Sequence, residues 1–169
     1  MRMADDIGLI HFIGIGGIGV SALATLAMEQ ECTVSGTDLI PSDITRELED
    51  NGAHIWIGSP EHAVLDPKSA LVVYSPAVPE THPLLLDAGK RGVRISSYPE
   101  VLGEISKSYY TIAVSGMHGK STTTSMLGVM LEYAGCDPLV IVGTKVPGWG
   151  GNIRIPKGTC SAELCVEKP

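Results

Sequence analysis

Residues 116–122 combine glycines, one lysine and two hydroxyl side chains, which are residue types that bind a phosphate chain. A glycine-bearing loop between a strand and a helix presents backbone amides and the positive helix N-terminus to phosphate. Lys120 would neutralise phosphate oxygens, and the hydroxyl of Ser121 would hold Mg²⁺. We therefore predict binding of ATP and Mg²⁺ here, with Lys120 as the catalytic residue. The predicted ATP-binding residues are Gly116, Met117, His118, Gly119, Lys120, Ser121 and Thr122.

The strict P-loop pattern is not met, because Val114 stands where that pattern has its first glycine. The segment is therefore interpreted as a shorter variant of the loop. The alternative is a helix start with Ser and Thr caps and a surface lysine. His118 could contact a phosphate or the substrate, or it could be merely solvated.

An earlier segment fits the pattern G-x-G-x-x-G, and it lies between a predicted strand and a predicted helix. Asp38 follows about twenty residues later, at the end of the next strand, where an acid can bond a ribose hydroxyl. This combination predicts nucleotide or dinucleotide binding. The alternative is a structural glycine turn with Asp38 as a surface acid. The residues of the pattern are Gly14, Ile15, Gly16, Gly17, Ile18 and Gly19.

Composition narrows the class of protein. Hydrophobic residues make up 44% of the 169 residues and charged residues 18%, so a folded chain is expected. The net charge of −7 and the lack of a basic stripe argue against a nucleic-acid partner. The sequence has no basic, apolar leader and no apolar run of membrane-spanning length, so a cytoplasmic protein is expected. Its four cysteines form no CxxC pair, and its five histidines have no metal-ligand spacing.

Strands and helices alternate along the sequence, which indicates an α/β fold with a doubly wound, Rossmann-like parallel sheet. The pattern restarts after Lys107, so we predict one domain over 1–107 and part of a P-loop-type α/β domain over 108–169. The predicted strands of the first domain are 7–13, 32–36, 54–57, 70–74 and 93–96, and its helices 20–30, 43–51, 83–91 and 99–106. Those of the second are strand 110–114, helix 121–134 and strand 139–142, followed by a glycine turn over 147–151 that carries Trp149.

Four segments resemble the UDP-N-acetylmuramate–L-alanine ligases of the Mur ligase family. The segment from His11 to Ser21 is similar nearly residue for residue, and Ser115 to Met126 resembles the family's ATP loop. Residues 35–38 and 75–78 match the ends of its second and fourth strands. The chain differs in having Met117 and Ser121 where the family usually has threonine, and Gly58-Ser59 where it often has Gly-His.

The resemblance implies that the first domain binds the UDP part of UDP-N-acetylmuramate. The residues between Gly14 and Gly19 would face the pyrophosphate, Asp38 would lie near the uridine, and Ser75 and Ala77 would also bind this substrate. The second domain would bind ATP and Mg²⁺. The lactyl carboxylate would then form an acyl phosphate, which L-alanine converts to an amide.

The resemblance also implies an acid near Mg²⁺ after residue 158, for which Glu163 or Glu167 is the candidate. The family continues past this point, so we expect a fragment that does not ligate alone, with an exposed sheet edge. Three alternatives stay open: a murein-tripeptide recycling ligase of the same family, an NAD-dependent oxidoreductase, and a non-catalytic nucleotide-binding remnant.

Overall fold

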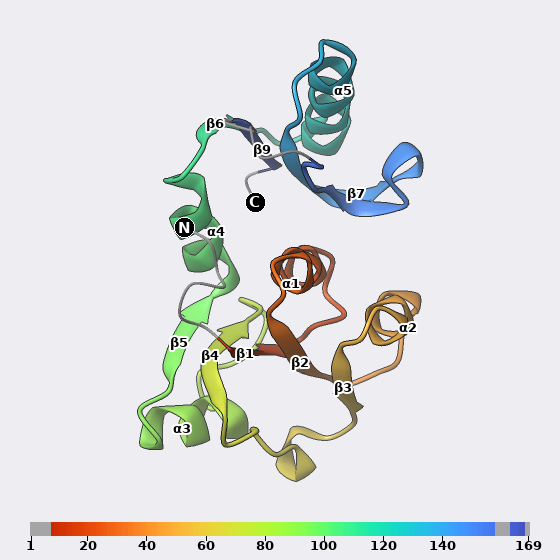
Figure 1. The fold of residues 1–169 in the computed structure, drawn as a ribbon. Helices are drawn as coiled ribbons and strands as arrows, with labels where there is room; N and C mark the ends of the chain where they lie inside the picture. Colours follow the sequence, from red (N-terminus) through yellow and green to blue (C-terminus); the bar gives the residue numbers. More distant parts are fainter. Residues whose placement is uncertain (1–7, 158–162, 168–169) are drawn as a thin grey trace. The chain divides into compact units, whose positions relative to one another are not determined.

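The computed structural model describes residues 8–157 and the backbone of a strand over 163–167 (Figure 1). The chain divides into two compact units between Leu102 and Gly103. Each unit has its own sheet and its own buried cluster. No helix of the described residues is long and apolar enough to cross a membrane.

The first unit is built on a five-stranded sheet in the order β3-β2-β1-β4-β5, in which every pair of neighbouring strands is parallel. Helices lie on both faces of this sheet, with α1 and α2 on one and α3 on the other (Figure 1). The predicted doubly wound α/β fold is confirmed. The strands are β1 (Leu9–Ile13), β2 (Thr33–Asp38), β3 (His54–Ile57), β4 (Ser69–Tyr74) and β5 (Arg94–Ser97), and the helices are α1 (Ile18–Glu29), α2 (Asp43–Asp50) and α3 (Pro83–Lys90). Helix α4 (Tyr98–Ser106) contains the boundary between the two units.

The strand order places a switch point beside β1. The chain runs from β1 outward to β2 and β3, then returns to lay β4 against the other side of β1. In such sheets the crevice outside the carboxyl ends of the strands, at the point where the order reverses, is the usual ligand site. The central strands are buried and apolar because helices cover them on both faces.

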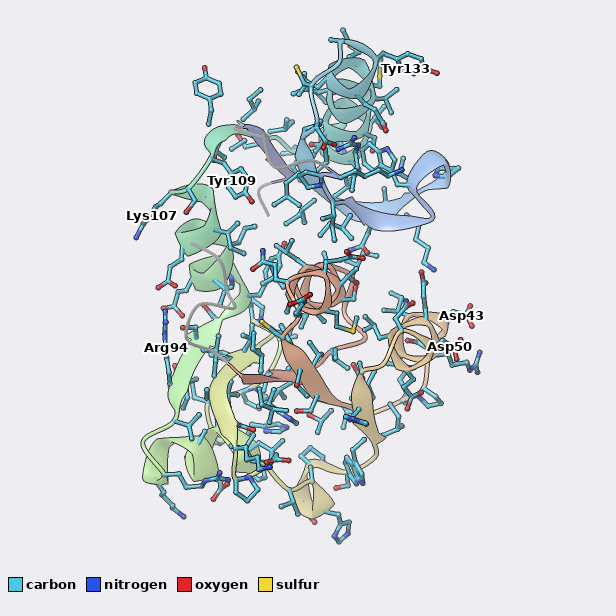
Figure 2. The ribbon with its side chains drawn as sticks, in the orientation of Figure 1. Asp43, Asp50, Arg94, Lys107, Tyr109 and Tyr133 are labelled. Atoms are coloured by element: carbon cyan, nitrogen blue, oxygen red, sulfur yellow. The ribbon has the colours of Figure 1, made fainter. Side chains whose placement is uncertain are left out.

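Local sequence explains how α2 begins and ends. Ser42 accepts a hydrogen bond from the Thr45 amide at 3.1 Å, and the Thr45 hydroxyl accepts one from the Ser42 amide at 2.9 Å. This capping box satisfies two otherwise unpaired donors. Gly52 follows the helix with a φ of +101°, which favours glycine. Asp43 and Asp50 point away from the sheet on the exposed side of α2 (Figure 2).

The second unit has a four-stranded sheet in the order β6-β9-β7-β8, with β8 antiparallel to β7. Helix α5 packs on β7 and β9, and Gly135 follows its C-cap with a φ of +83°. The elements are β6 (Tyr110–Val114), α5 (Lys120–Tyr133), β7 (Leu139–Val146), the 3₁₀ turn η3 (Pro147–Trp149), β8 (Gly151–Arg154) and β9 (Glu163–Glu167).

Strand β7 differs from the prediction, because it continues to Val146 and pairs with β8 in a hairpin. The glycine turn reverses the chain there, since Gly150 has a φ of +73°. Trp149 fills space in this turn and packs against α5. A Cβ on Gly128 would lie 2.8 Å from its ring, and its ring nitrogen donates to Glu132 at 3.3 Å.

Candidate nucleotide-binding sites

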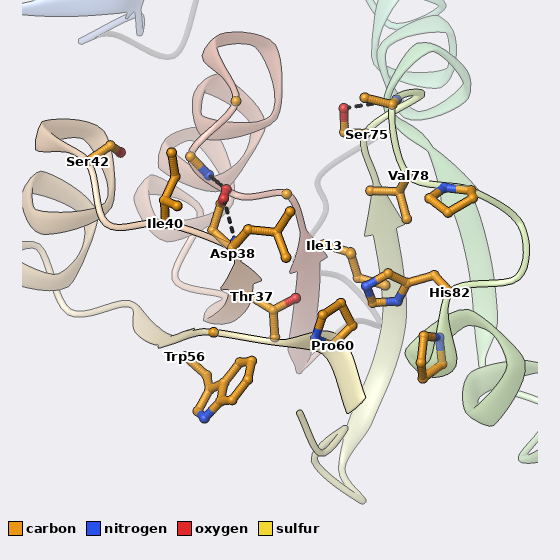
Figure 3. Close-up of a pocket in the computed structure, with 18 of the residues that line it drawn as sticks. Ile13, Thr37, Asp38, Ile40, Ser42, Trp56, Pro60, Ser75, Val78 and His82 are labelled. Atoms are coloured by element: carbon orange, nitrogen blue, oxygen red, sulfur yellow. Dashed lines mark hydrogen bonds between the residues drawn. The ribbon is translucent and has the colours of Figure 1, made fainter. Parts of the chain in front are cut away.

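A cavity of about 660 Å³ lies at the carboxyl ends of β1 to β4 in the first unit (Figure 3). The ends of these strands and the loops that follow them form its walls, at the switch point of the sheet. The structure brings together here six of the nine residues predicted to bind the UDP substrate. These six are Gly14, Gly16, Gly17, Asp38, Ser75 and Ala77.

Asp38 ties the first glycine loop to the end of β2. Its Oδ2 accepts a hydrogen bond from the Gly16 amide at 2.8 Å, and its Oδ1 accepts one from the Leu39 amide at 2.7 Å. The Gly16 amide was expected to face a pyrophosphate, whereas here it donates to a carboxylate. An ionised carboxylate has about four lone-pair sites, so Asp38 retains acceptor capacity for a hydroxyl in the pocket.

The glycines of the first loop serve different purposes. Gly14 has a φ of +75° and makes the tight turn that the pattern predicts. A Cβ on Gly16 would lie 2.9 Å from Asp38 Oδ2, so glycine is needed for the contact between the loop and β2. Gly17 is the N-cap of α1 and has no side chain to cap the helix.

Three residues of the motif do not line the pocket. Ile15 is fully buried and packs over Gly36, where a Cβ would lie 2.5 Å from the Ile15 side chain. Ile18 begins α1. Gly19 makes room for Tyr98 of α4, whose ring would lie 2.8 Å from an added Cβ, so its close packing is with a helix and not with the strand that was expected.

The loop after β4 closes the pocket on the side of β1. The Ser75 amide donates to the Ile13 carbonyl at 3.1 Å, and the Ser75 hydroxyl accepts from the Ala77 amide at 3.3 Å. A Cβ on Gly14 would lie 3.2 Å from Ser75 Cβ, so the two loops are in direct contact. This contact explains why both segments contribute to one cavity.

Two histidines of the first unit were not among the predicted site residues. His82 lines the pocket and caps α3, where its Nδ1 accepts from the Leu84 amide at 3.3 Å. His11 on β1 is 3% exposed, and its Nδ1 lies 2.9 Å from Ser35 Oγ. Burial and the neighbouring His82 lower the pKa of His11 to about 4, against a smaller opposing effect of Asp66. Burial also lowers the pKa of His82.

Trp56, Leu39, Ile40 and Ser42 also line the pocket and were not predicted. Leu39 and Ile40 are 64% and 70% exposed, which makes an unusual apolar pair directly after an acid at a strand end. Two apolar residues directly after this acid were a feature of the sequence that could have indicated a binding site. Trp56 lies on β3 and reaches the pocket only through the register of the sheet, so no local pattern indicated it.

The second glycine loop joins β6 to α5 and is exposed. Gly119, with a φ of +78°, is the N-cap of α5, and no side chain caps the helix. Lys120 is the first residue of the helix, and its Nζ donates to the Gly116 carbonyl at 2.9 Å. The lysine therefore folds back over the loop, near the place where the helix N-terminus favours an anion. Met117 is 87% exposed.

The register of β9 decides which acid lies beside this loop. Strand β9 pairs in parallel with β6, with Glu163 opposite Tyr110 and Glu167 opposite Val114. Four residues of strand span roughly 13 Å. Glu163, the favoured magnesium ligand, is therefore at the end of the strand away from the loop, and Glu167 is at the near end. Among the described residues, no group of three or more His, Cys, Asp or Glu could hold a metal ion.

A doubly wound sheet with a pocket at its switch point, followed by a strand, a glycine–lysine loop and a helix, is an architecture typical of nucleotide-binding α/β proteins. The chain belongs to the Mur ligase family. The family model described as "Mur ligase family, catalytic domain" matches residues 9–110. The predicted resemblance is thereby confirmed.

Relatives of the chain include two curated UDP-N-acetylmuramate–L-alanine ligases. The protein from Clostridium botulinum (strain Kyoto / Type A2) is 41% identical over 149 residues, which are 88% of this chain and 32% of that protein. The protein from Alkaliphilus metalliredigens is 42% identical over 147 residues, or 86% of this chain and 32% of that protein. The chain thus spans about a third of the length of these relatives.

Solved structures of two ligases are also similar. One is UDP-N-acetylmuramate:L-alanyl-gamma-D-glutamyl-meso-diaminopimelate ligase from Neisseria meningitides, with a TM-score of 0.84, 29% identity and coverage of 95% of this chain and 52% of that one. The other is UDP-N-acetylmuramate–alanine ligase from Thermotoga maritima, with a TM-score of 0.82, 29% identity and coverage of 94% and 36%.

Proposed function

We propose that the chain carries the UDP-N-acetylmuramate pocket and the ATP loop of a ligase that joins L-alanine to the lactyl carboxylate of that sugar nucleotide. This reaction belongs to peptidoglycan synthesis, and its use of ATP and UDP-sugars fits the cytoplasm. The observation that carries the proposal is the convergence of the first glycine loop, Asp38 and the β4 loop on one cavity at the switch point. The curated relatives named above bear the same activity in their names.

The first unit would hold the UDP part of the substrate, with the glycine loop and Ser75 near the phosphates and Asp38 near the ribose. The second unit would hold ATP. Lys120 already lies over the loop at α5, where it would neutralise phosphate oxygens. Ser121 follows it in the first turn and offers a hard hydroxyl oxygen to Mg²⁺, which usually takes most of its ligands from water and substrate phosphates.

In the proposed reaction, the lactyl carboxylate attacks the γ-phosphate of ATP and forms an acyl phosphate, with ADP as leaving group. The amine of L-alanine then attacks the acyl carbon, loses a proton and displaces phosphate. Lys120 would stabilise the charge on the phosphoryl group during its transfer. The residues that select the amino acid are not assigned to this chain.

A second candidate is the ligase that attaches a murein tripeptide to UDP-N-acetylmuramate. A structure carrying that name from Neisseria meningitides has a TM-score of 0.84, slightly above that of the alanine ligase. Both candidates share the sugar nucleotide and ATP. They differ in the acceptor, so phosphate release with L-alanine or with the tripeptide would separate them in a protein that turns over.

The proposal is tested by calorimetric titration of the chain with UDP-N-acetylmuramate and, separately, with NADH. A Gly16→Ala variant places a Cβ 2.9 Å from Asp38 Oδ2 and 3.1 Å from Thr45 Cγ2, so it disturbs the loop in the pocket. We expect its affinity for UDP-N-acetylmuramate to fall at least about tenfold. Gly89→Ala is the matched control, because no heavy atom lies within 4 Å of its added Cβ.

Saturable binding of UDP-N-acetylmuramate that weakens in Gly16→Ala and not in Gly89→Ala would support the proposal. Binding of NADH without binding of UDP-N-acetylmuramate would overturn it, and the first loop would then be a dinucleotide site. Equal affinity of both variants for UDP-N-acetylmuramate would show that the substrate does not contact the first glycine loop.

A further inference from the structure

We propose, building on the proposed function, that Trp56 is the platform on which the base of the bound nucleotide stacks. The pocket would thus have a phosphate end at the first glycine loop and a base end at β3. The ligand class that this arrangement recognises is a nucleoside diphosphate. Trp56 would be a residue that determines affinity for the base and takes no part in the chemistry.

The register of the sheet places Trp56 beside the acid. Trp56 pairs with Thr37 and Ile57 with Asp38 across the parallel strands β3 and β2. The Gly58 amide donates to the Asp38 carbonyl at 2.9 Å, which joins the ends of the two strands. Asp38 in turn binds the Gly16 amide at 2.8 Å. A ribose held by Asp38 therefore has the glycine loop on one side and β3 on the other.

The two sides of the pocket also carry different side chains. Figure 3 shows Trp56, Asp38 and Ile40 on one side of the cavity, and Ser75, Val78 and His82 on the other. Trp56 has the largest aromatic ring among the described lining residues, and Ile40 on the same side of the cavity is 70% exposed. Aromatic side chains bind bases by stacking because every base has a π-face, with little dependence on its identity.

Gly58 fixes the position of the indole. A Cβ at residue 58 would lie 2.9 Å from Cη2 and 3.1 Å from Cζ2 of Trp56, so the ring occupies the space that a side chain would fill. Gly58 also has a φ of +146°, which an L side chain rarely adopts. The absence of a side chain at residue 58 thus leaves room for the ring to pack against the backbone at the end of β3. A platform held in place before the ligand arrives loses less freedom on binding.

The alternative is that Trp56 only covers the edge of the sheet, since β3 is an edge strand. A covering role predicts that Trp56→Leu lowers stability without a selective effect on nucleotides. A stacking role predicts that an aromatic replacement retains binding. Trp56→Phe therefore separates the two roles, because it keeps a π-face with a smaller area.

The experiment uses the full chain with UDP as the probe. Calorimetry measures the affinity of the wild type, Trp56→Leu, Trp56→Phe and, as the matched control, Trp149→Leu in the second unit. We expect Trp56→Leu to bind UDP roughly tenfold or more weakly, as loss of one stacked base does elsewhere. Trp56→Phe should recover most of the affinity, and Trp149→Leu should bind as the wild type does. Melting temperatures are recorded for every variant.

Fluorescence supplies an independent readout, because the sequence contains two tryptophans, Trp56 and Trp149. In a Trp149→Phe background, UDP should change the Trp56 emission saturably at the affinity that calorimetry gives. Gly58→Ala should weaken UDP binding with Trp56 intact, because it displaces the ring.

If UDP does not bind to the wild type, both the proposed function and this inference are rejected. Binding of UDP that is equal in the wild type and Trp56→Leu, without a change of Trp56 emission, would overturn this inference alone. Loss of binding in Trp56→Leu that Trp56→Phe does not recover would also reject stacking.

Discussion

At the scale of single residues, Lys120 makes the contact that bears most directly on phosphate binding. Its Nζ donates to the Gly116 carbonyl of its own loop at 2.9 Å. A phosphate at the start of α5 would replace this neutral acceptor with an anionic one, so that Lys120 would form an ion pair with it. We expect Lys120→Ala to lower the affinity for MgATP at least about tenfold, as measured by calorimetry.

Lys90→Ala is the control for this prediction, because Lys90 is an exposed lysine at the end of α3 in the first unit. It should bind MgATP as the wild type does. If Lys120→Ala also binds as the wild type does, then Lys120 does not touch the nucleotide, and the loop is only a capped helix start.

A second prediction concerns His11, whose pKa burial lowers from 6.5 to about 4. The unfolded chain takes up this proton near pH 6.5 and the folded chain only near pH 4, so the unfolded state binds more protons in between. The free energy of unfolding should therefore fall as the pH is lowered through this window, by roughly 3 kcal/mol in total from this group. His82 acts in the same direction, because its pKa is lowered too.

His11→Gln isolates this effect, since glutamine does not titrate and retains a polar group near Ser35. Urea unfolding at several pH values between 7 and 4 measures it. The wild type should lose more stability than the variant on acidification. Parallel curves for the two proteins would show that His11 titrates normally in the folded state.

The residues of the pocket differ in how far the sequence could predict them. Gly14, Gly16 and Asp38 belong to one pattern whose spacing has a local physical cause, the turn between strand and helix, so they were found. Trp56 and His82 lie on other elements and reach the pocket only after the strands have paired. No pattern in a single sequence predicts which strands pair, so these side chains were not predicted to line the pocket.

At the scale of elements, Gly36 shows how tightly the first loop packs on β2. It is buried, and a Cβ there would lie 2.5 Å from Ile15 Cδ1, 2.9 Å from Ile15 Cβ and 3.0 Å from the Phe12 carbonyl. Two of these three atoms cannot move without shifting backbone. We expect Gly36→Ala to lower the free energy of unfolding by about 1–3 kcal/mol in urea titrations.

Gly89→Ala serves as the matched control here as well. Gly89 lies in α3 with no heavy atom within 4 Å of an added Cβ, so alanine should be neutral or stabilise by up to about 1 kcal/mol. Equal stability of Gly36→Ala and Gly89→Ala would mean that Ile15 packs less closely against β2 than the structure shows.

The elements of the first unit were predicted closely, because β1 and β4 are largely apolar runs and glycines, prolines and helix caps mark where many of its elements end. The elements of the second unit were harder to predict from the sequence. The turn over 147–151 was recognised, but the pairing of β7 with β8 was not, since a turn alone does not state that its flanks pair. The sequence likewise left Glu163 and Glu167 both open as the acid near Mg²⁺, because only the register of β9 with β6 decides which end of the strand lies near the loop.

At the scale of the whole molecule, the chain contains two units with separate cores, and each has one glycine-bearing loop between a strand and a helix. The sequence prediction divided the chain after Lys107, whereas the compact units divide between Leu102 and Gly103, within α4. The division of roles remains a proposal: the sugar nucleotide would occupy the first unit and ATP the second. Neither site uses the other's loop, so the two ligands should not compete.

The most direct test of this account is simultaneous occupancy. MgATP is titrated by calorimetry into the chain already saturated with UDP-N-acetylmuramate. We predict one further saturable site per chain, with no release of the sugar nucleotide. Displacement of UDP-N-acetylmuramate by MgATP, or a failure of either ligand to bind, would contradict the assignment of one nucleotide to each glycine loop.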